Sequence, residues 1–220
     1  MSKHLMERID EIIEIKSLLK HPFYQAWTMG TLPLSSLERY AEQYFHFEAA
    51  YPTFLSGLHH RCADPSIRQM ILDNLWDEEH GDENHIELWL RFCDRLGLDR
   101  SSMLNGKMVA ATANLINSYR DMTSSGSIAS GAAALYAFES QVPAVAKEKI
   151  DGLGRFYGIE DERSVSFFRV HQILDEVHSS TEREMVGSLT MKEDAYEEVV
   201  ETVDRAVTIL WEFLDGVYQA

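Results

Sequence analysis

Cysteine is scarce in this sequence, which has only Cys62 and Cys93 in 220 residues. The two cysteines do not form a CxxC pair, so the sequence predicts neither a disulfide framework nor a zinc ribbon. Long apolar runs are also missing, since none approaches the 18 residues that a membrane-spanning helix needs. The first ten residues are too charged for a secretory signal peptide. We therefore expect a cytoplasmic protein that is not inserted in a membrane.

Positive charge is in short supply as well. Lys and Arg together number 20 against 36 Asp and Glu, which gives a formal net charge of −16. Such a chain repels the phosphate backbone of a nucleic acid unless a local basic patch is present, and the sequence contains no such patch. We therefore expect no nucleic-acid partner.

Strand patterns are the third absence, because no apolar run alternates with period two between turn residues. Apolar residues recur instead at spacings of three and four, which is typical of helices. The sequence predicts an all-α bundle in one domain, residues 1–220, large enough to bury a substantial core without disulfides. We expect seven long or medium helices and a short one, at about 5–19, 23–29, 34–61, 64–97, 101–122, 128–156, 161–189 and 190–218.

His171, Asp175 and His178 form the most informative pattern in the chain. At 100° per residue these three side chains fall within about 60° of one another around a helix, so they leave the same face. Spacings of four and three residues bring helical neighbours to roughly 5 to 6 Å, so Asp175 could share one metal ion with His171 and a second with His178. In the alternative interpretation, this is a polar outer face on which both histidines are merely solvated.

Two more stretches supply carboxylates and a histidine. Glu78 and His85 lie two helical turns apart on one face, although an axial rise of about 10.5 Å is long for one ion unless two metals or a distortion at Gly81 closes the gap. Glu139 interrupts an otherwise apolar helix, where an unpaired carboxylate is costly to bury. Nitrogen and oxygen ligands without thiolates suit iron or manganese, and helix bundles commonly house dinuclear sites of this kind.

These stretches resemble the family of the chlamydial protein that associates with death domains, and the resemblance runs along nearly the whole chain. Its most specific segments are 74–89, 133–150 and 171–178. The resemblance implies a haem-oxygenase-like bundle of about seven to eight helices, shared with the pyrroloquinoline-quinone synthases and the TenA thiaminases. It also implies two divalent metal ions, Fe/Fe or Mn/Fe, bound by Glu78, His85, Glu139, His171, Asp175 and His178.

The same resemblance implies a reaction. Members of the family are linked to folate biosynthesis as p-aminobenzoate synthases that consume one of their own tyrosines, with a lysine supplying the amino group and with dioxygen and a reductant as co-substrates. Tyr24 matches the consumed tyrosine and Lys149 matches the lysine. From the residues alone, Tyr24 is an amphipathic aromatic at a helix start and Lys149 a solvated charge.

Two positions depart from the family pattern. Phe138 and Phe167 stand where the resemblance implies tyrosines. If those tyrosines pass a radical between the metal ions and the consumed residue, this chain needs another route, and the available phenols are those of Tyr40, Tyr44 and Tyr136.

Other functions remain open at this point. An oxidase of the same fold could act on a diffusible small molecule, and the chain could be a non-enzymatic binding protein. A thiaminase-like hydrolase would need a nucleophilic cysteine, and neither Cys62 nor Cys93 has a suggestive setting. Bundles of this type often form homodimers, and the surface we expect for this is the apolar stripe of the last helix: Val199, Val203, Val207, Leu210 and Leu214.

Overall fold

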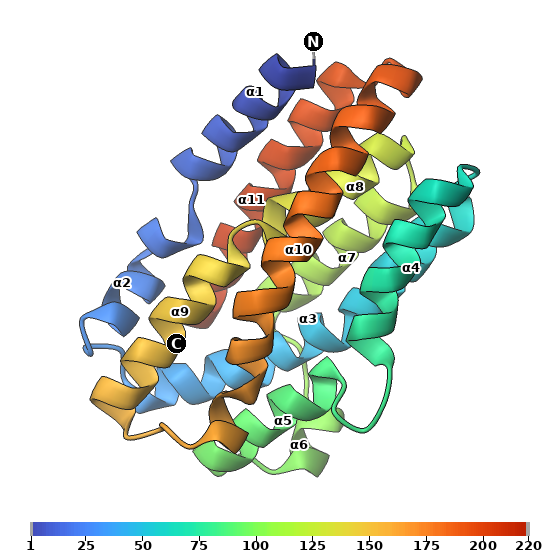
Figure 1. Ribbon diagram of the computed structural model, residues 1–220. Helices are drawn as coiled ribbons and strands as arrows, with labels where there is room; N and C mark the ends of the chain where they lie inside the picture. The colour runs from blue at the N-terminus through green and yellow to red at the C-terminus, as the bar shows by residue number, and fades with distance from the viewer. Residues whose placement is uncertain (1, 219–220) are drawn as a thin grey trace.

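The computed structural model describes residues 2–218, and within them the regular structure is entirely helical, which confirms the predicted all-α class (Figure 1). A 3-10 turn (Leu18–Lys20) follows the first helix and a π-helical turn (Leu153–Tyr157) follows the ninth. The α-helices are α1 (Ser2–Ile15), α2 (Pro22–Thr28), α3 (Leu34–Arg61), α4 (Pro65–Glu79), α5 (His85–Leu96), α6 (Arg100–Leu104), α7 (Ala110–Ser124), α8 (Ile128–Glu139), α9 (Val142–Gly152), α10 (Glu162–Glu193) and α11 (Tyr196–Tyr218).

Helix α10 runs through the bundle and organises the packing around it. It packs against α8, α9 and α5, and Figure 1 shows it crossing the molecule between these helices. Its start is capped by Asp161, whose side chain accepts a hydrogen bond from the backbone N–H of Ser164 at 3.1 Å. The buried apolar side chains form one continuous cluster in which Trp27, Trp89 and Phe47 have no exposed surface. The residues of α10 that face this cluster are therefore surrounded by other helices.

The helix expected at 64–97 is divided in two, so the prediction of one continuous helix was wrong. Gly81 has a φ of 83°, and it lies in the turn that separates α4 from α5. Asn84 then starts α5, because its side-chain oxygen accepts a hydrogen bond from the backbone N–H of Glu87 at 3.0 Å. The distortion that the sequence allowed at Gly81 is a complete turn, and Glu78 and His85 lie on different helices.

Two other expected helices are also divided. The segment 128–156 breaks after Glu139, and Pro143 occupies the first turn of α9, where the missing N–H of proline is tolerated. The segment 101–122 breaks between α6 and α7, because the Gln43 side chain binds the backbone N–H of Val109 and the hydroxyl of Thr112. Both breaks are set by tertiary contacts or terminal caps, which hydrophobic spacing does not reveal.

The structure contradicts the expectation that the last helix begins at Thr190. Its hydroxyl donates to the carbonyl of Val186 at 2.7 Å inside α10, which continues to Glu193. The helix ends instead at Asp194, which adopts a left-handed φ of 51°.

The apolar stripe of α11 is part of the core. Its five members are at most 4% exposed, and α11 packs against α7, α8 and α1. This stripe is therefore not available as a dimer interface. The homodimer stays a prediction, and it would have to form through another surface. No helix among residues 2–218 is both long and apolar enough to cross a membrane.

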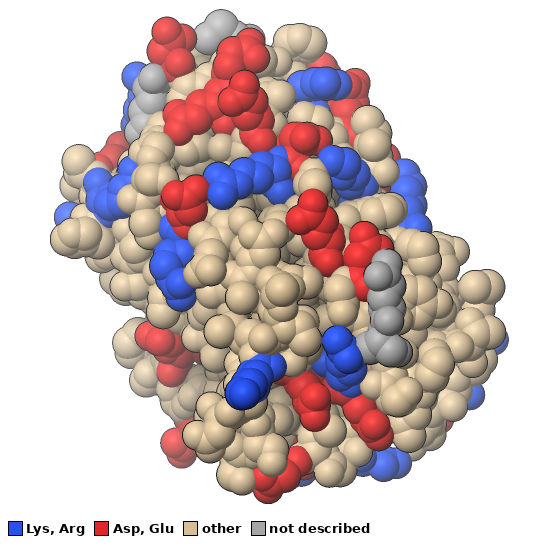
Figure 2. All heavy atoms as spheres, turned by 180° about the vertical axis from the view of Figure 1, so that it is seen from behind, with Lys and Arg blue, Asp and Glu red and all other residues tan. Residues whose placement is uncertain are grey.

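The outer surface carries mixed charge. Figure 2 shows acidic and basic side chains interspersed on the face opposite to that of Figure 1. Exposed cations commonly pair with acids, as Arg205 does with Asp121 at 2.9 Å and Arg183 with Asp10 at 2.7 Å. Such exposed pairs contribute little to stability, so the bundle depends mainly on its apolar core.

A glycine sets the distance between α2 and α9. A Cβ atom on Gly152 would lie 2.5 Å from the indole ring of Trp27, whose side chain is fully buried. The absence of a side chain at Gly152 thus lets the two helices approach, and this approach brings Lys149 of α9 to the side of α2 that carries Tyr24.

We predict that Gly152→Ala lowers the free energy of unfolding by about 1 to 3 kcal/mol, because the added methyl group overpacks a site that cannot relax. Gly154→Ala is the matched control, since its Cβ would meet the flexible, exposed side chain of Glu160 at 3.3 Å. Thermal unfolding followed by circular dichroism measures both. Equal midpoints for the two variants would contradict this account of the α2–α9 contact.

Candidate metal centre

The six residues that the sequence singled out as ligands all lie inside the bundle, with exposed fractions between 2% and 7%. The alternative in which His171 and His178 are solvated on an outer face is therefore wrong. Helix ends position several of these residues, because Glu139 is the last residue of α8 and His85 is the first of α5. The turn at Gly81 brings Glu78 Oε2 to 2.8 Å from His85 Nδ1, which removes the long axial separation expected for one helix.

One cluster contains Glu139, Asp175 and His178, whose ligand atoms lie within 4.8 Å of one another. His178 Nδ1 is 3.6 Å from Asp175 Oδ1 and 3.7 Å from Glu139 Oε2. The other ring nitrogen of His178 lies 3.1 Å from Asp77 Oδ2 and donates to it. This hydrogen bond fixes the ring orientation and leaves Nδ1 facing the two carboxylates, as in histidines that bind metal ions.

Side chains from α3 and α4 hold the Glu139 carboxylate in place. The Tyr51 hydroxyl donates to Oε1, and the Asn74 amide donates to both oxygens, at 2.9 and 3.2 Å. A carboxylate oriented in this way has lone pairs left for a cation.

A second cluster contains Glu48, His85 and His171, again with ligand atoms within 4.8 Å of one another. Glu78 adjoins this cluster through its 2.8 Å contact with His85. His171 Nδ1 donates to the carbonyl of Phe167 at 2.7 Å, so Nε2 is the ring nitrogen free to accept a cation. The structure thus divides the six sequence candidates between two neighbouring clusters on α10.

The electrostatics of the interior show the cost of burying these charges. Burial raises the pKa of Asp175 to about 7, and burial likewise raises the pKa of Glu139. Burial opposes protonation of His85, but the neighbouring Glu78 carboxylate outweighs it and raises the pKa of His85 to about 9. Burial and the charge of His85 lower the pKa of His171 well below its usual value, which keeps this imidazole neutral.

Several buried polar atoms at the centre lack a protein partner. Among the described residues, Asp175 Oδ2, His178 Nδ1 and both carboxylate oxygens of Glu182 have no hydrogen-bond partner. Buried acceptors of this kind are normally satisfied, so their convergence fits bound cations. Oxygen and imidazole nitrogen without thiolate is a donor set for iron or manganese.

Sequence reasoning missed two buried acids near the centre. Glu48 lies in the middle of α3 and is 3% exposed, and Glu182 of α10 is 1% exposed. The signal for Glu48 is an acid among aromatic and small residues, the same signal that identified Glu139. Glu182 follows His178 by four residues and continues the face of His171 and Asp175, so periodicity alone could have indicated its direction.

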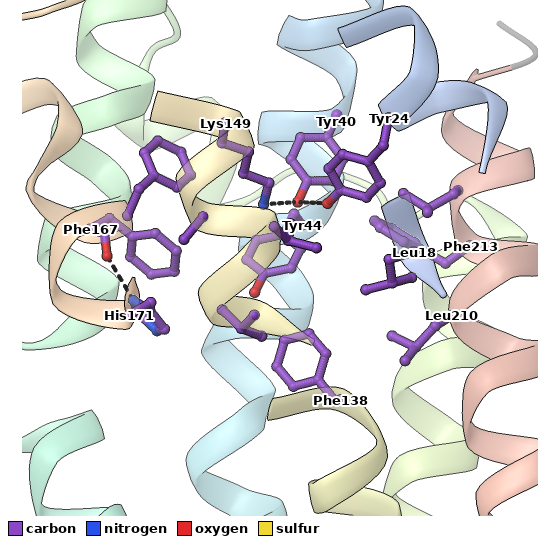
Figure 3. A pocket seen from close by; sticks show the side chains of 15 residues that line it. Leu18, Tyr24, Tyr40, Tyr44, Phe138, Lys149, Phe167, His171, Leu210 and Phe213 are labelled. Atoms are coloured by element: carbon purple, nitrogen blue, oxygen red, sulfur yellow. Dashed lines mark hydrogen bonds between the residues drawn. The ribbon is translucent and has the colours of Figure 1, made fainter. Parts of the chain in front are cut away.

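An aromatic pocket lies beside the two clusters, and it contains Tyr24 and Lys149 (Figure 3). Lys149 Nζ donates to the Tyr40 hydroxyl at 2.7 Å, and the Tyr40 and Tyr24 hydroxyls are 3.3 Å apart. Lys149 Nζ is 5.6 Å from the centre of the Tyr24 ring. The interpretation of Lys149 as a solvated charge is wrong, because this residue is 5% exposed. His171, a member of the second cluster, also lines the pocket, so the pocket adjoins that cluster.

Solved structures define the class of protein to which this bundle belongs. A TenA homologue from Pseudomonas syringae has the same fold, with a TM-score of 0.82 at 14% identity over 99% of this chain and 92% of that one. This fold is the haem-oxygenase-like helical bundle.

Within that class, residues 38–211 match the sequence profile of a family described as iron-containing redox enzymes, and the chain belongs to this family. A 4-aminobenzoate synthase from Nitrosomonas europaea is 43% identical, over 97% of this chain and 90% of that protein. A 4-aminobenzoate synthase from Chlamydia pneumoniae is 38% identical, over 96% of this chain and 93% of that protein.

We predict that His85→Ala and Asp175→Ala each lower the amount of bound iron or manganese, because a metal site requires its full ligand set. The helical content should be unchanged, since the apolar core forms without metal. Glu176→Ala removes an exposed carboxylate from the same helix and serves as the control. Metal analysis after dialysis measures the effect, and an unaltered metal content in both ligand variants would refute the assignment.

Proposed function

We propose that this protein is a p-aminobenzoate synthase that uses its own Tyr24 as the source of the ring and Lys149 as the source of the amino group. The observation that carries the proposal is the position of Lys149, which lies buried against the Tyr24 ring and is linked to its hydroxyl through Tyr40. The names of the relatives from Nitrosomonas and Chlamydia support the same reaction.

In this proposal two divalent ions, Fe/Fe or Mn/Fe, are held by Glu78, His85, Glu139, His171, Asp175 and His178. When bound, such ions would supply redox chemistry, with dioxygen as the oxidant. The electrons that reduce dioxygen would come from the tyrosine and from an external reductant. The surrounding protein orients the ligands through Asn74, Tyr51 and Asp77. The packed bundle keeps bulk water from the reacting side chains.

The amine of Lys149 is prepared for reaction by its surroundings. Burial lowers the pKa of Lys149 to about 7, so the neutral amine is well populated near neutral pH. Tyr40 accepts the hydrogen bond of this amine and fixes its position next to Tyr24. A neutral, positioned amine is the form that can donate a nitrogen lone pair.

The size of the pocket favours an internal substrate over a diffusible one. Its volume is about 30 Å³. An engineered cavity that holds benzene measures about 150 Å³. An oxidase of a diffusible aromatic substrate would need more room, but Tyr24 already places a phenol ring in the pocket wall.

The phenylalanines at positions 138 and 167 line the pocket and offer no hydroxyl. Tyr136 is directed elsewhere, because its hydroxyl bonds to Asp10 and Arg183. Tyr40 and Tyr44 stack with ring centres 5.5 Å apart between Tyr24 and the second cluster. We infer that these two phenols carry the electron and proton transfer that the family pattern gives to other tyrosines.

A thiaminase-like hydrolase finds no support in the cysteines. Neither Cys62 nor Cys93 lines the pocket, and both thiols are buried. Burial raises the pKa of Cys93, which disfavours a reactive thiolate.

The proposed reaction predicts that metal-loaded protein, given reductant and dioxygen, releases at most one p-aminobenzoate per chain. Tyr24→Phe should retain the parent amount of metal yet release no product, because the phenol to be consumed is missing. Product is measured by liquid chromatography and the spent chain by peptide mass. Many turnovers on an added small molecule, with Tyr24 intact, would select the diffusible-substrate oxidase instead.

The pKa of Lys149 predicts the pH dependence of this single turnover. Below about pH 7 the amine is protonated, so product formation should rise between roughly pH 6 and 8 and then level off. Metal content measured at each pH separates this effect from metal loss. Lys149→Arg, which stays protonated, should form no product at any of these pH values. A rate that is constant across the range, at constant metal content, would contradict the role of the neutral amine.

A further inference from the structure

We propose that Glu48 is a further metal ligand, which completes the coordination of the ion bound at His85 and His171. The inference rests on the proposed function, because it assumes that the centre binds two ions. Glu48 comes from α3, which contributes none of the six ligands nominated by the sequence. One of its carboxylate oxygens lies within 4.8 Å of ligand nitrogens on both histidines.

The surroundings of Glu48 resemble those of Glu139 in the other cluster. The Tyr51 hydroxyl donates a hydrogen bond to Glu139, and the Tyr44 hydroxyl lies beside the carboxylate of Glu48. Tyr44, Glu48 and Tyr51 are spaced by four and three residues, so they occupy one face of α3. A single neighbouring hydroxyl does not use up the acceptor capacity of a carboxylate, so lone pairs remain for a cation.

The composition of the two clusters gives an independent reason. The cluster of His178 has two carboxylates, Glu139 and Asp175. Without Glu48, the cluster of His85 and His171 has no carboxylate of its own, and Glu78 adjoins it only through its contact with His85. With Glu48, each ion has two carboxylates beside it, whose charges match its own, and the fifth buried acid, Glu182, belongs to neither cluster. Charge balance matters here because an uncompensated charge in a dry interior is very costly.

Glu48 also connects the centre to the aromatic pocket. Tyr44, whose hydroxyl lies beside Glu48, lines the pocket together with Lys149 and stacks on Tyr40. A metal ligand at Glu48 therefore places the first phenol of the proposed Tyr44–Tyr40–Tyr24 route next to the coordination shell. A purely structural Glu48 would give no such link.

The experiment compares metal binding by the parent chain, Glu48→Gln and Glu42→Gln. Glutamine keeps the size of the side chain but removes the charge, and Glu42 is an exposed acid on the same helix. Metal-free protein is titrated anaerobically with Fe(II) or Mn(II), and bound metal is counted after gel filtration. We expect two ions in the parent and in Glu42→Gln, and at least about tenfold weaker binding of one ion in Glu48→Gln.

Two ions bound to Glu48→Gln with the affinities of the parent would overturn the proposal while leaving the centre itself intact. A parent chain that binds no metal would instead refute the proposed function. If Glu48→Gln does not fold, as judged by circular dichroism, Glu48→Asp decides the question, because it keeps the charge but shortens the reach. Weaker binding of one ion by Glu48→Asp than by Glu42→Gln supports the ligand, and equal affinities refute it.

Discussion

Neutralising carboxylates inside an apolar bundle is the constraint on which the rest of this structure depends. Glu78, Glu139 and Asp175 share one interior with His85 and His178, and the carboxylates raise the pKa of both histidines to about 9 against the effect of burial. Ion pairs with histidine offset part of the burial cost, but unpartnered oxygens remain at Asp175 and Glu182. Cations would satisfy these atoms directly, so the interior is suited to positive charge beyond that of the two histidines.

Much of this arrangement could be predicted from the sequence. The spacing of His171, Asp175 and His178 indicated one face of a helix, and all three side chains are buried on α10. Glu139 stood out because a carboxylate in an apolar helix needs a partner. The all-α class followed from periodicity over the whole chain. These features depend on local spacing and composition, which a sequence displays directly.

Other features depend on contacts between segments that are distant in the sequence. Gln43 of α3 caps the start of α7, and no pattern near Val109 announces this break. Glu48 meets His85 and His171 only through the packing of three helices. The burial of Lys149 likewise follows from the close approach of α9 to α2 at Gly152. From the sequence alone, Lys149 was interpreted as a solvated charge. Its burial depends on the fold, and its neighbours in the chain do not reveal it.

The polar centre and the aromatic pocket impose opposite demands on the same bundle. The centre gathers charge and needs rigid ligands, which helix termini and hydrogen bonds from α3 and α4 provide. In the proposed reaction the pocket needs a neutral amine and a confined phenol, and burial favours the neutral amine by lowering the pKa of Lys149 to about 7. Tyr44 lies where the two regions meet, since it lines the pocket and its hydroxyl lies beside Glu48. A bundle that holds an acid-rich centre a few side chains from a buried lysine thus separates two different electrostatic environments with a layer of aromatic rings.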